Sequence, residues 1–232
     1  MGTKDIKPSL IFLHGFGGRS EQWSRVFPLL DNYFQCIAID LPGHGKNKQS
    51  VAESANDLII KTIDLTEAKE VAVLAHSYSG FLALDAALDS RVKWLCLVGS
   101  ALEIKIHPSL LLQWEKREWD VNFIRSCLRK KDGLNEAELF AGFKSLGSAT
   151  SNVWGIADQR SVPLLPKTCQ VTVLVPALDR VVSPRKGRAL AESIPNATLK
   201  ILADSDHYVH LDMPEYFSQH VIEAAIEAHY LE

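Results

Sequence analysis

The chain has 232 residues, of which 47% are hydrophobic and 23% are charged, and its formal net charge is -3. This length suits one α/β domain with a large core, and the composition is typical of soluble globular proteins rather than disordered or membrane proteins. The charge excludes a global basic field for nucleic acid or an anionic membrane, and no apolar run approaches the ~18 residues of a membrane helix. We therefore expect a cytoplasmic protein that binds neither.

Six short apolar runs alternate with helical patterns along the chain. Runs of this kind are typical of strands covered by helices on both faces, as in a parallel sheet. We therefore predict an α/β fold with a mostly parallel sheet of at least six strands. The predicted strands are 10–13, 36–39, 71–75, 95–98, 171–175 and 199–202.

Helix start signals follow several of these strands. Ser50 with Glu53 forms a possible capping box, and Ser183 before Pro184 suits an N-cap followed by the first helical position. Residues 212–215 open the last helix in the same manner. The chain is therefore predicted to end on a helix.

Residues 103–167 contain no strand-like run, so we predict a helical lid inserted between the fourth and fifth strands. Residues 1–102 and 168–232 then form the core. The lid is rich in aromatic residues and is expected to cover a pocket. These residues are Trp114, Trp119, Phe123, Phe140, Phe143 and Trp154.

Ser77 follows the third predicted strand and has small neighbours. A nucleophilic serine on a strained turn between a strand and a helix needs such neighbours, and Ala75, Ser79 and Gly80 meet that need. The usual pattern has glycine on both sides of the serine, so this match is looser. The alternative is an ordinary loop serine. His76 and Ser79 do not occupy the central position, and we expect both to be structural.

A glycine-rich loop, residues 14–18, follows the first predicted strand. Glycine lets backbone amides point at a ligand in a tight bend, so the amides of Phe16 and Tyr78 are candidates for an oxyanion hole. Such a loop could also hold phosphate, but it lacks the G-x-G-x-x-G spacing and the P-loop lysine. The phosphate alternative is therefore the weaker one.

Asp179 and His207 follow the last two predicted strands. A serine hydroxyl needs a base and a carboxylate that orients it, and the carboxyl ends of parallel strands meet at one edge of the sheet. We therefore predict Ser77 as nucleophile, His207 as base and Asp179 as acid. Asp204, Asp206 and Glu103 are the rivals of Asp179. His210 is expected to begin the final helix or to line the pocket mouth.

These motifs resemble those of the α/β-hydrolase superfamily from about Ser9 to the last helix. The resemblance is carried by residues 14–18, 40–45, the turn at Ser77, and residues 178–179 and 206–207. It implies hydrolysis of a carboxylic ester through an acyl-enzyme, without cofactor or metal, and the aromatic insertion predicts a short or medium acyl chain. Asp206 departs from the glycine common before the catalytic histidine of relatives, which could change the basicity of His207 or complete a turn.

Residues 178–186 are similar to those of the carboxylesterases that cleave pimeloyl-acyl-carrier-protein methyl ester. That resemblance implies an acyl-carrier protein as a possible partner, docked through Arg125, Arg129 and Lys130; a solvated helix face is the alternative. Two other functions within the superfamily remain as alternatives. One is the menaquinone-pathway synthase, which usually has an arginine near the positions of Phe81 and Leu82. The other is a receptor of the same fold with low turnover.

Overall fold

A computed structural model describes residues 7–48, 55–104, 108–116, 118–129, 133–147 and 161–232. The proposed capping box at Ser50 and Glu53, together with Lys130 and Trp154, lies outside these residues, as does the side chain of Trp114. In the part of the chain that is described, no helix is long and apolar enough to cross a membrane.

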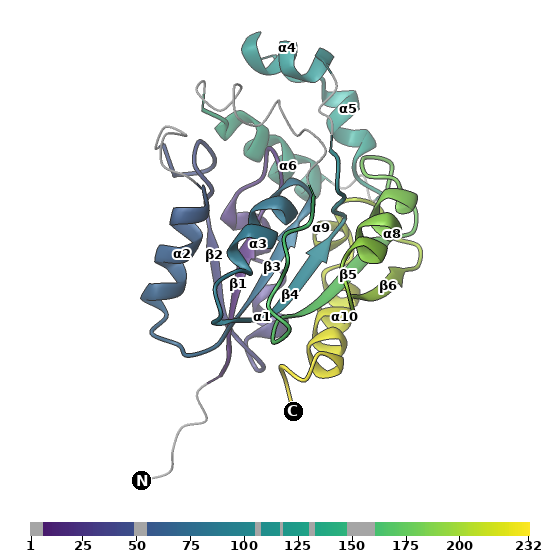
Figure 1. Ribbon diagram of the computed structural model, residues 1–232. Coiled ribbons are helices and arrows are strands. Elements are labelled where there is room, and N and C mark those ends of the chain that lie inside the picture. The colour runs from purple at the N-terminus through teal and green to yellow at the C-terminus, as the bar shows by residue number, and fades with distance from the viewer. Residues whose placement is uncertain (1–6, 49–54, 105–107, 117, 130–132, 148–160) are drawn as a thin grey trace.

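The predicted parallel sheet is confirmed (Figure 1). Its six strands pair in parallel in the order β2-β1-β3-β4-β5-β6. The strand β4 begins three residues earlier than expected because Lys93 interrupts its apolar run. The strands are β1 (Ser9–Leu13), β2 (Gln35–Ile39), β3 (Val71–His76), β4 (Val92–Val98), β5 (Gln170–Pro176) and β6 (Thr198–Leu202).

The strand order reverses at β1, which pairs with β2 on one side and with β3 on the other. The connections that leave β1 and β3 at their carboxyl ends therefore run to opposite sides of the sheet. A crevice for ligands forms at such a switch point in open α/β sheets. The glycine-rich loop follows β1 and Ser77 follows β3, so both predicted motifs lie at this point.

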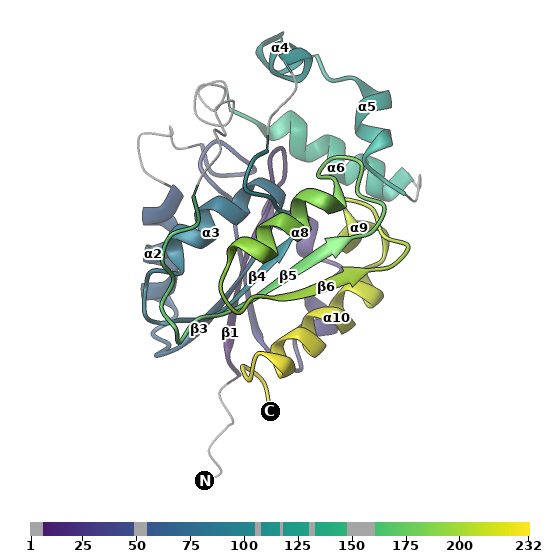
Figure 2. The ribbon, with the colours of Figure 1, turned by 45° about the vertical axis from the view of Figure 1, so that its right-hand side comes forward.

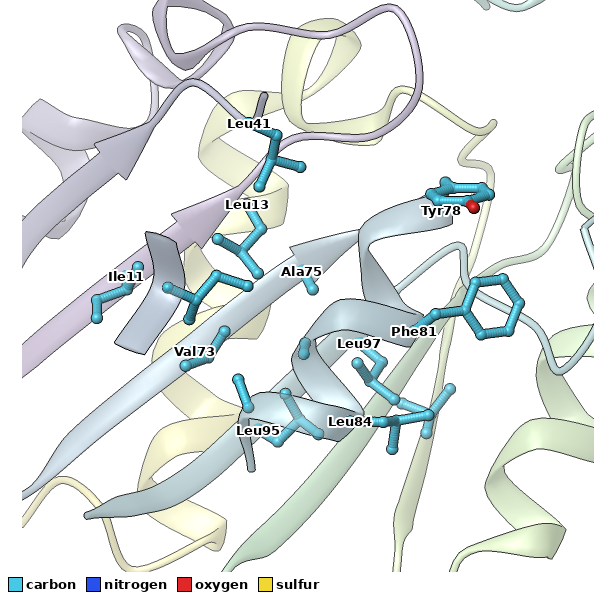
Figure 3. Packing of buried hydrophobic residues seen from close by; sticks show 14 of the residues in the cluster. Ile11, Leu13, Leu41, Val73, Ala75, Tyr78, Phe81, Leu84, Leu95 and Leu97 are labelled. Atoms are coloured by element: carbon cyan, nitrogen blue, oxygen red, sulfur yellow. The ribbon is translucent and has the colours of Figure 1, made fainter. Parts of the chain in front are cut away.

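Alternate residues of the inner strands enter two separate cores. Ile11, Val73 and Leu95 belong to one core, and Leu10, Leu74 and Trp94 belong to the other. The first core packs against α2 (Ala55–Leu65), α3 (Gly80–Ala86) and α8 (Pro184–Ser193), as Figure 3 shows for β3 and α3. The second packs against α1 (Phe27–Leu30) and α10 (Pro214–Glu227). Helices on both faces explain why the strands lack the alternation of half-exposed strands.

The described residues between β4 and β5 include three helices. They are α4 (Pro108–Lys116), α5 (Val121–Ser126) and α6 (Gly133–Ser145), and they lie at the carboxyl end of the sheet, opposite both termini (Figures 1 and 2). Asp120 caps α5 by accepting a hydrogen bond from the amide of Asn122 at 2.8 Å. Arg19, near the glycine-rich loop, forms an ion pair with Glu138 of α6 at 2.6 Å.

Short helical turns complete the fold. They are η1 (Ser20–Trp23), η2 (Ser77–Ser79) and α9 (Val209–Asp212). Ser183 stands at the N-cap of α8 as expected, but its side chain makes no capping hydrogen bond. The last helix, α10, begins at Pro214, with Pro at its first position.

Candidate active site

The turn at Ser77 has a strained backbone. Ser77 has φ of +56°, a left-handed conformation that is uncommon outside glycine and clusters at functional sites. Its carbonyl accepts a hydrogen bond from Ser100 Oγ at 2.9 Å. A Cβ atom at Gly80 would lie 2.6 Å from the same Oγ, so only glycine fits there. Close packing against the loop after β4 therefore explains the small residue at position 80.

Ser79 occupies the second flanking position, where glycine is usual. Its side chain is fully buried, and its Oγ lies 2.9 Å from the carbonyl of His76 and 3.1 Å from the carbonyl of Leu13. Both carbonyls are acceptors, so the hydroxyl is satisfied within the turn and can join the turn to the end of β1. The serine thus replaces glycine without leaving a buried polar atom unpaired.

Ser77, His207 and Asp179 form one chain of hydrogen bonds, although they come from three different loops. His207 Nε2 lies 3.0 Å from Ser77 Oγ, and His207 Nδ1 lies 2.8 Å from Asp179 Oδ2. All three residues are buried, with 6%, 2% and 5% of their surfaces exposed. This geometry suits transfer of a proton from the serine to Nε2 while the carboxylate fixes the imidazole ring.

Asp179 is held in place by its own loop. Its Oδ1 accepts hydrogen bonds from the amides of Val181 at 2.8 Å and Val182 at 2.7 Å, which leaves Oδ2 for His207. The rivals have other positions: Asp204 faces Arg129 on the surface, and Asp206 accepts hydrogen bonds from Arg180. The structure therefore pairs His207 with Asp179.

Two buried histidines shape the glycine-rich loop beside the nucleophile. His14 Nδ1 donates to the carbonyl of Gly15 at 2.8 Å, and its Nε2 accepts from the amide of Leu41 at 3.0 Å. His44 Nε2 accepts from the amide of Gly17 at 3.3 Å. Accepting roles require neutral rings. Burial lowers the pKa of His14 to about 4 and the pKa of His44 well below its usual value, so both remain neutral at pH 7.

A cavity of about 230 Å³ opens beside Ser77 and His207. Phe16 and Tyr78, the residues whose amides were predicted to form the oxyanion hole, both line it. Phe123 of α5 and Phe143 of α6 also line it, whereas Phe140 lines a separate hollow between α5 and α6. The ring of Trp119 lies 5.1 Å from that of Phe143. Aromatic residues between β4 and β5 therefore line the cavity beside the reactive groups.

The helix α6 touches the backbone of the glycine-rich loop directly. A Cβ atom at Gly142 would lie 2.3 Å from the carbonyl oxygen of Gly17. Gly17 has φ of +67°, and a Cβ there would lie 2.6 Å from the Phe143 ring. Neither position has room for a side chain, so the two backbones can approach only because both residues are glycine.

We expect Gly142→Ala to lower kcat/KM on small esters by about tenfold to a hundredfold, because the added methyl group must displace the loop that carries Phe16. Gly133→Ala in the same helix is the matched control, since a Cβ there meets nothing within 4 Å. The measurement is ester hydrolysis with a thermal melt of each variant. Equal activity of the two variants would contradict the expectation.

His76 has the structural role expected for it, since its Nε2 donates to the carbonyl of His207 at 2.9 Å. Gly99 and Ser100, near the reactive groups, were not predicted from sequence. Gly99 has φ of +54°, and a Cβ there would lie 3.2 Å from Asp179 Oδ2. The sequence signal that could have indicated Gly99 and Ser100 is that both are small residues directly after the apolar run of β4.

His210 does not line the pocket mouth, so that alternative of the prediction is wrong. It lies fully buried in α9, with its ring stacked on Trp23 at 4.4 Å. Neither ring nitrogen has a hydrogen-bond partner among the described residues. The short turn α9 directs the side chain away from the cavity and into the second core.

The predicted docking arginines face carboxylates of the protein itself. Arg125 Nε donates to Glu136 at 3.0 Å, and Arg129 Nη1 lies 3.9 Å from Asp204. The third residue, Lys130, lies outside the described residues. Carrier docking stays a prediction. In the described part of the chain, no group of three or more His, Cys, Asp or Glu residues could hold a metal ion.

Comparison with known proteins gives consistent matches. The model of the Alpha/beta hydrolase family matches residues 10–220. The chain is 24% identical to the uncharacterized hydrolase YugF of Bacillus subtilis (strain 168), over 93% of this chain and 89% of that protein. It is 30% identical to the pimeloyl-[acyl-carrier protein] methyl ester esterase of Wigglesworthia glossinidia brevipalpis, over 62% of this chain and 54% of that protein.

A solved structure shares the fold over nearly the whole chain. The esterase RhEst1 from Rhodococcus sp. ECU1013 superimposes with a TM-score of 0.81, at 21% identity, and the match covers 97% of this chain and 92% of that one. At this identity the likeness concerns the fold alone.

Proposed function

Because the chain belongs to the alpha/beta hydrolase family, we propose that it hydrolyses carboxylic esters through an acyl-enzyme formed on Ser77. The observation that supports this proposal most directly is the continuous hydrogen-bond chain from Ser77 Oγ through His207 to Asp179, which opens on a cavity. The strained backbone of Ser77 is a second support.

In the proposed reaction, Ser77 Oγ attacks the ester carbonyl carbon while its proton passes to His207 Nε2. The amides of Phe16 and Tyr78 hold the negative oxygen of the tetrahedral intermediate. The carbon–oxygen bond to the alcohol then breaks, and His207 returns its proton to the leaving alcohol. Water, deprotonated by His207, attacks the acyl-serine and releases the acid, which restores Ser77.

The cavity supports an acyl group of short or medium length. Its volume of about 230 Å³ is below the ~300–1,000 Å³ that drug-sized ligands usually occupy. Much of its lining is aromatic or aliphatic, from Phe16, Ile104 and Val182 among others. An apolar chain is therefore the group that this cavity would best remove from water.

The test is a panel of p-nitrophenyl esters from acetate to palmitate, together with a carrier-bound methyl ester such as the one named for the Wigglesworthia relative. We expect the highest kcat/KM on butyrate to octanoate and very low activity on palmitate. Mass spectrometry of acid-quenched samples should show the acyl group on the peptide that contains Ser77. A folded sample with no ester hydrolysis and no adduct would overturn the proposal and favour the receptor alternative.

A further inference from the structure

One buried carboxylate joins the loop after β5 to the loop after β6. Asp206 Oδ1 accepts a hydrogen bond from the amide of His207 at 2.8 Å and another from the amide of Arg180 at 3.2 Å. Asp206 Oδ2 accepts from Arg180 Nε at 2.8 Å and also from its Nη2. Asp179 and His207 each lie directly beside one of these residues in the chain, so the contacts span the two loops that carry them.

The same guanidinium reaches the lid. Arg180 Nη2 donates to the carbonyl of Leu128, just after α5, at 3.4 Å. The side chain of Asp206 is 3% exposed and that of Arg180 is 56% exposed, so the carboxylate depends on these donors while the arginine also meets water. Arg180 additionally lines the cavity. The pair thus lies where both loops and the lid meet.

We propose that Asp206 and Arg180 are positioning residues. They join the two loops and so keep the His207 ring and the Asp179 carboxylate at hydrogen-bond distance from each other. This inference rests on the proposed function. The physical reason is that a reacting group must be held within about 0.5 Å of its productive place. The amide of Leu178 also donates to the carbonyl of Ser205 at 2.8 Å, so backbone and side-chain contacts both join the two loops.

The pair also balances charge next to the base. Removing the guanidinium leaves an unpaired carboxylate that favours a protonated His207, whereas neutralising the carboxylate leaves an unpaired cation that disfavours it. Several other charged or titratable groups surround His207 and remain the same in all variants. They are Asp179 after β5, His76 of β3, Tyr208 of its own loop, His210 of α9, and Glu103, Lys186 and Cys127 across the cavity.

The experiment compares Arg180→Met, Asp206→Asn and the double variant on a p-nitrophenyl ester, with the full pH profile of kcat/KM. We expect each single change to lower kcat by about tenfold or more with little change in KM. The double variant should be no worse than either single variant, because the two residues act as one unit. The acid limb of the pH profile should move to higher pH in Arg180→Met and to lower pH in Asp206→Asn, by about half a unit or more. In the double variant it should lie at the wild-type position.

Arg91→Met is the matched control. Arg91 forms a similar pair with Asp89 at 2.6 Å, but it precedes β4 at the opposite end of the sheet, so activity and profile should not change. Arg180→Lys, which keeps the charge without the forked geometry, covers the case in which Arg180→Met fails to fold; it should recover the pH profile but only part of kcat.

The positioning role would be overturned if both single variants kept kcat within twofold of the wild type. It would also be overturned if their acid limbs moved in the same direction. Failure of the proposed function is distinguishable, since the wild-type protein itself would then hydrolyse no ester.

Discussion

Replacing Ser77 with alanine is expected to lower kcat on p-nitrophenyl esters by ~10⁵-fold to 10⁶-fold, without loss of the fold. Alanine removes the Oγ atom that forms the acyl bond and that lies 3.0 Å from His207 Nε2. The remaining activity should reflect only the oxyanion donors and substrate binding. The measurement is steady-state kinetics on highly purified variants, with circular dichroism to verify folding.

Two comparisons make this result specific to the nucleophile. The double variant Ser77→Ala/His207→Ala should be no slower than Ser77→Ala, because the base has no function once the nucleophile is absent. Ser193→Ala is the matched control: its Oγ donates to the carbonyl of Leu190 at the end of α8, so full activity is expected. A fluorophosphonate should label the wild type and Ser193→Ala but not Ser77→Ala. Unchanged hydrolysis in Ser77→Ala would exclude the proposed mechanism.

The second large effect expected is a steep loss of stability between pH 6.5 and about pH 4. Four histidines are fully buried with lowered pKa values, chiefly because burial disfavours the charged ring. The pKa of His14 falls to about 4 and that of His210 to about 3, while the pKa values of His44 and His76 fall well below 6.5. In the unfolded chain these histidines have ordinary pKa values, so it binds protons at a pH at which the folded protein does not.

The direction of this pH dependence follows from the linkage between proton binding and folding. Where the unfolded state binds more protons than the folded state, stability decreases as the pH is lowered. For these histidines the decrease begins as the pH drops through about 6.5 and ends at the folded pKa. By pH 5, His14 and His210 each reduce the free energy of unfolding by about 2 kcal/mol relative to pH 7, and His44 and His76 lower it further in the same direction. Total stabilities are typically about 5–15 kcal/mol, so we expect acid unfolding to begin near pH 5.

His210→Phe tests this account. Phenylalanine keeps a ring against Trp23 and Phe217, and it removes two nitrogens that have no hydrogen-bond partner among the described residues. We expect it to be more stable than the wild type at pH 5 by about 2 kcal/mol, with a smaller dependence on pH. Urea unfolding at pH 7, 6 and 5 measures this, with His229→Asn as control because His229 is exposed. Identical pH dependence in all three proteins would contradict the assignment.

Local sequence patterns predicted most of the fold and the candidate site. The six strands are visible because buried parallel strands are continuous apolar runs, which depend only on neighbouring residues. Ser77, Asp179 and His207 could be selected because each directly follows such a run, and carboxyl ends of parallel strands share one edge. The sequence by itself therefore determined the architecture, the candidate nucleophile and the residues that could serve it.

Tertiary structure decided the features that depend on contacts between distant segments. Gly142 and Gly17 are 125 positions apart, yet their backbones touch; Arg180 and Asp206 meet across two loops; His210 enters a core although it is close in sequence to His207. No local periodicity or spacing encodes such pairs, because which segments meet is set by the packing of the whole chain. Asp206 shows the difference: the sequence marked it as unusual, and only the contact with Arg180 indicated what it holds in place.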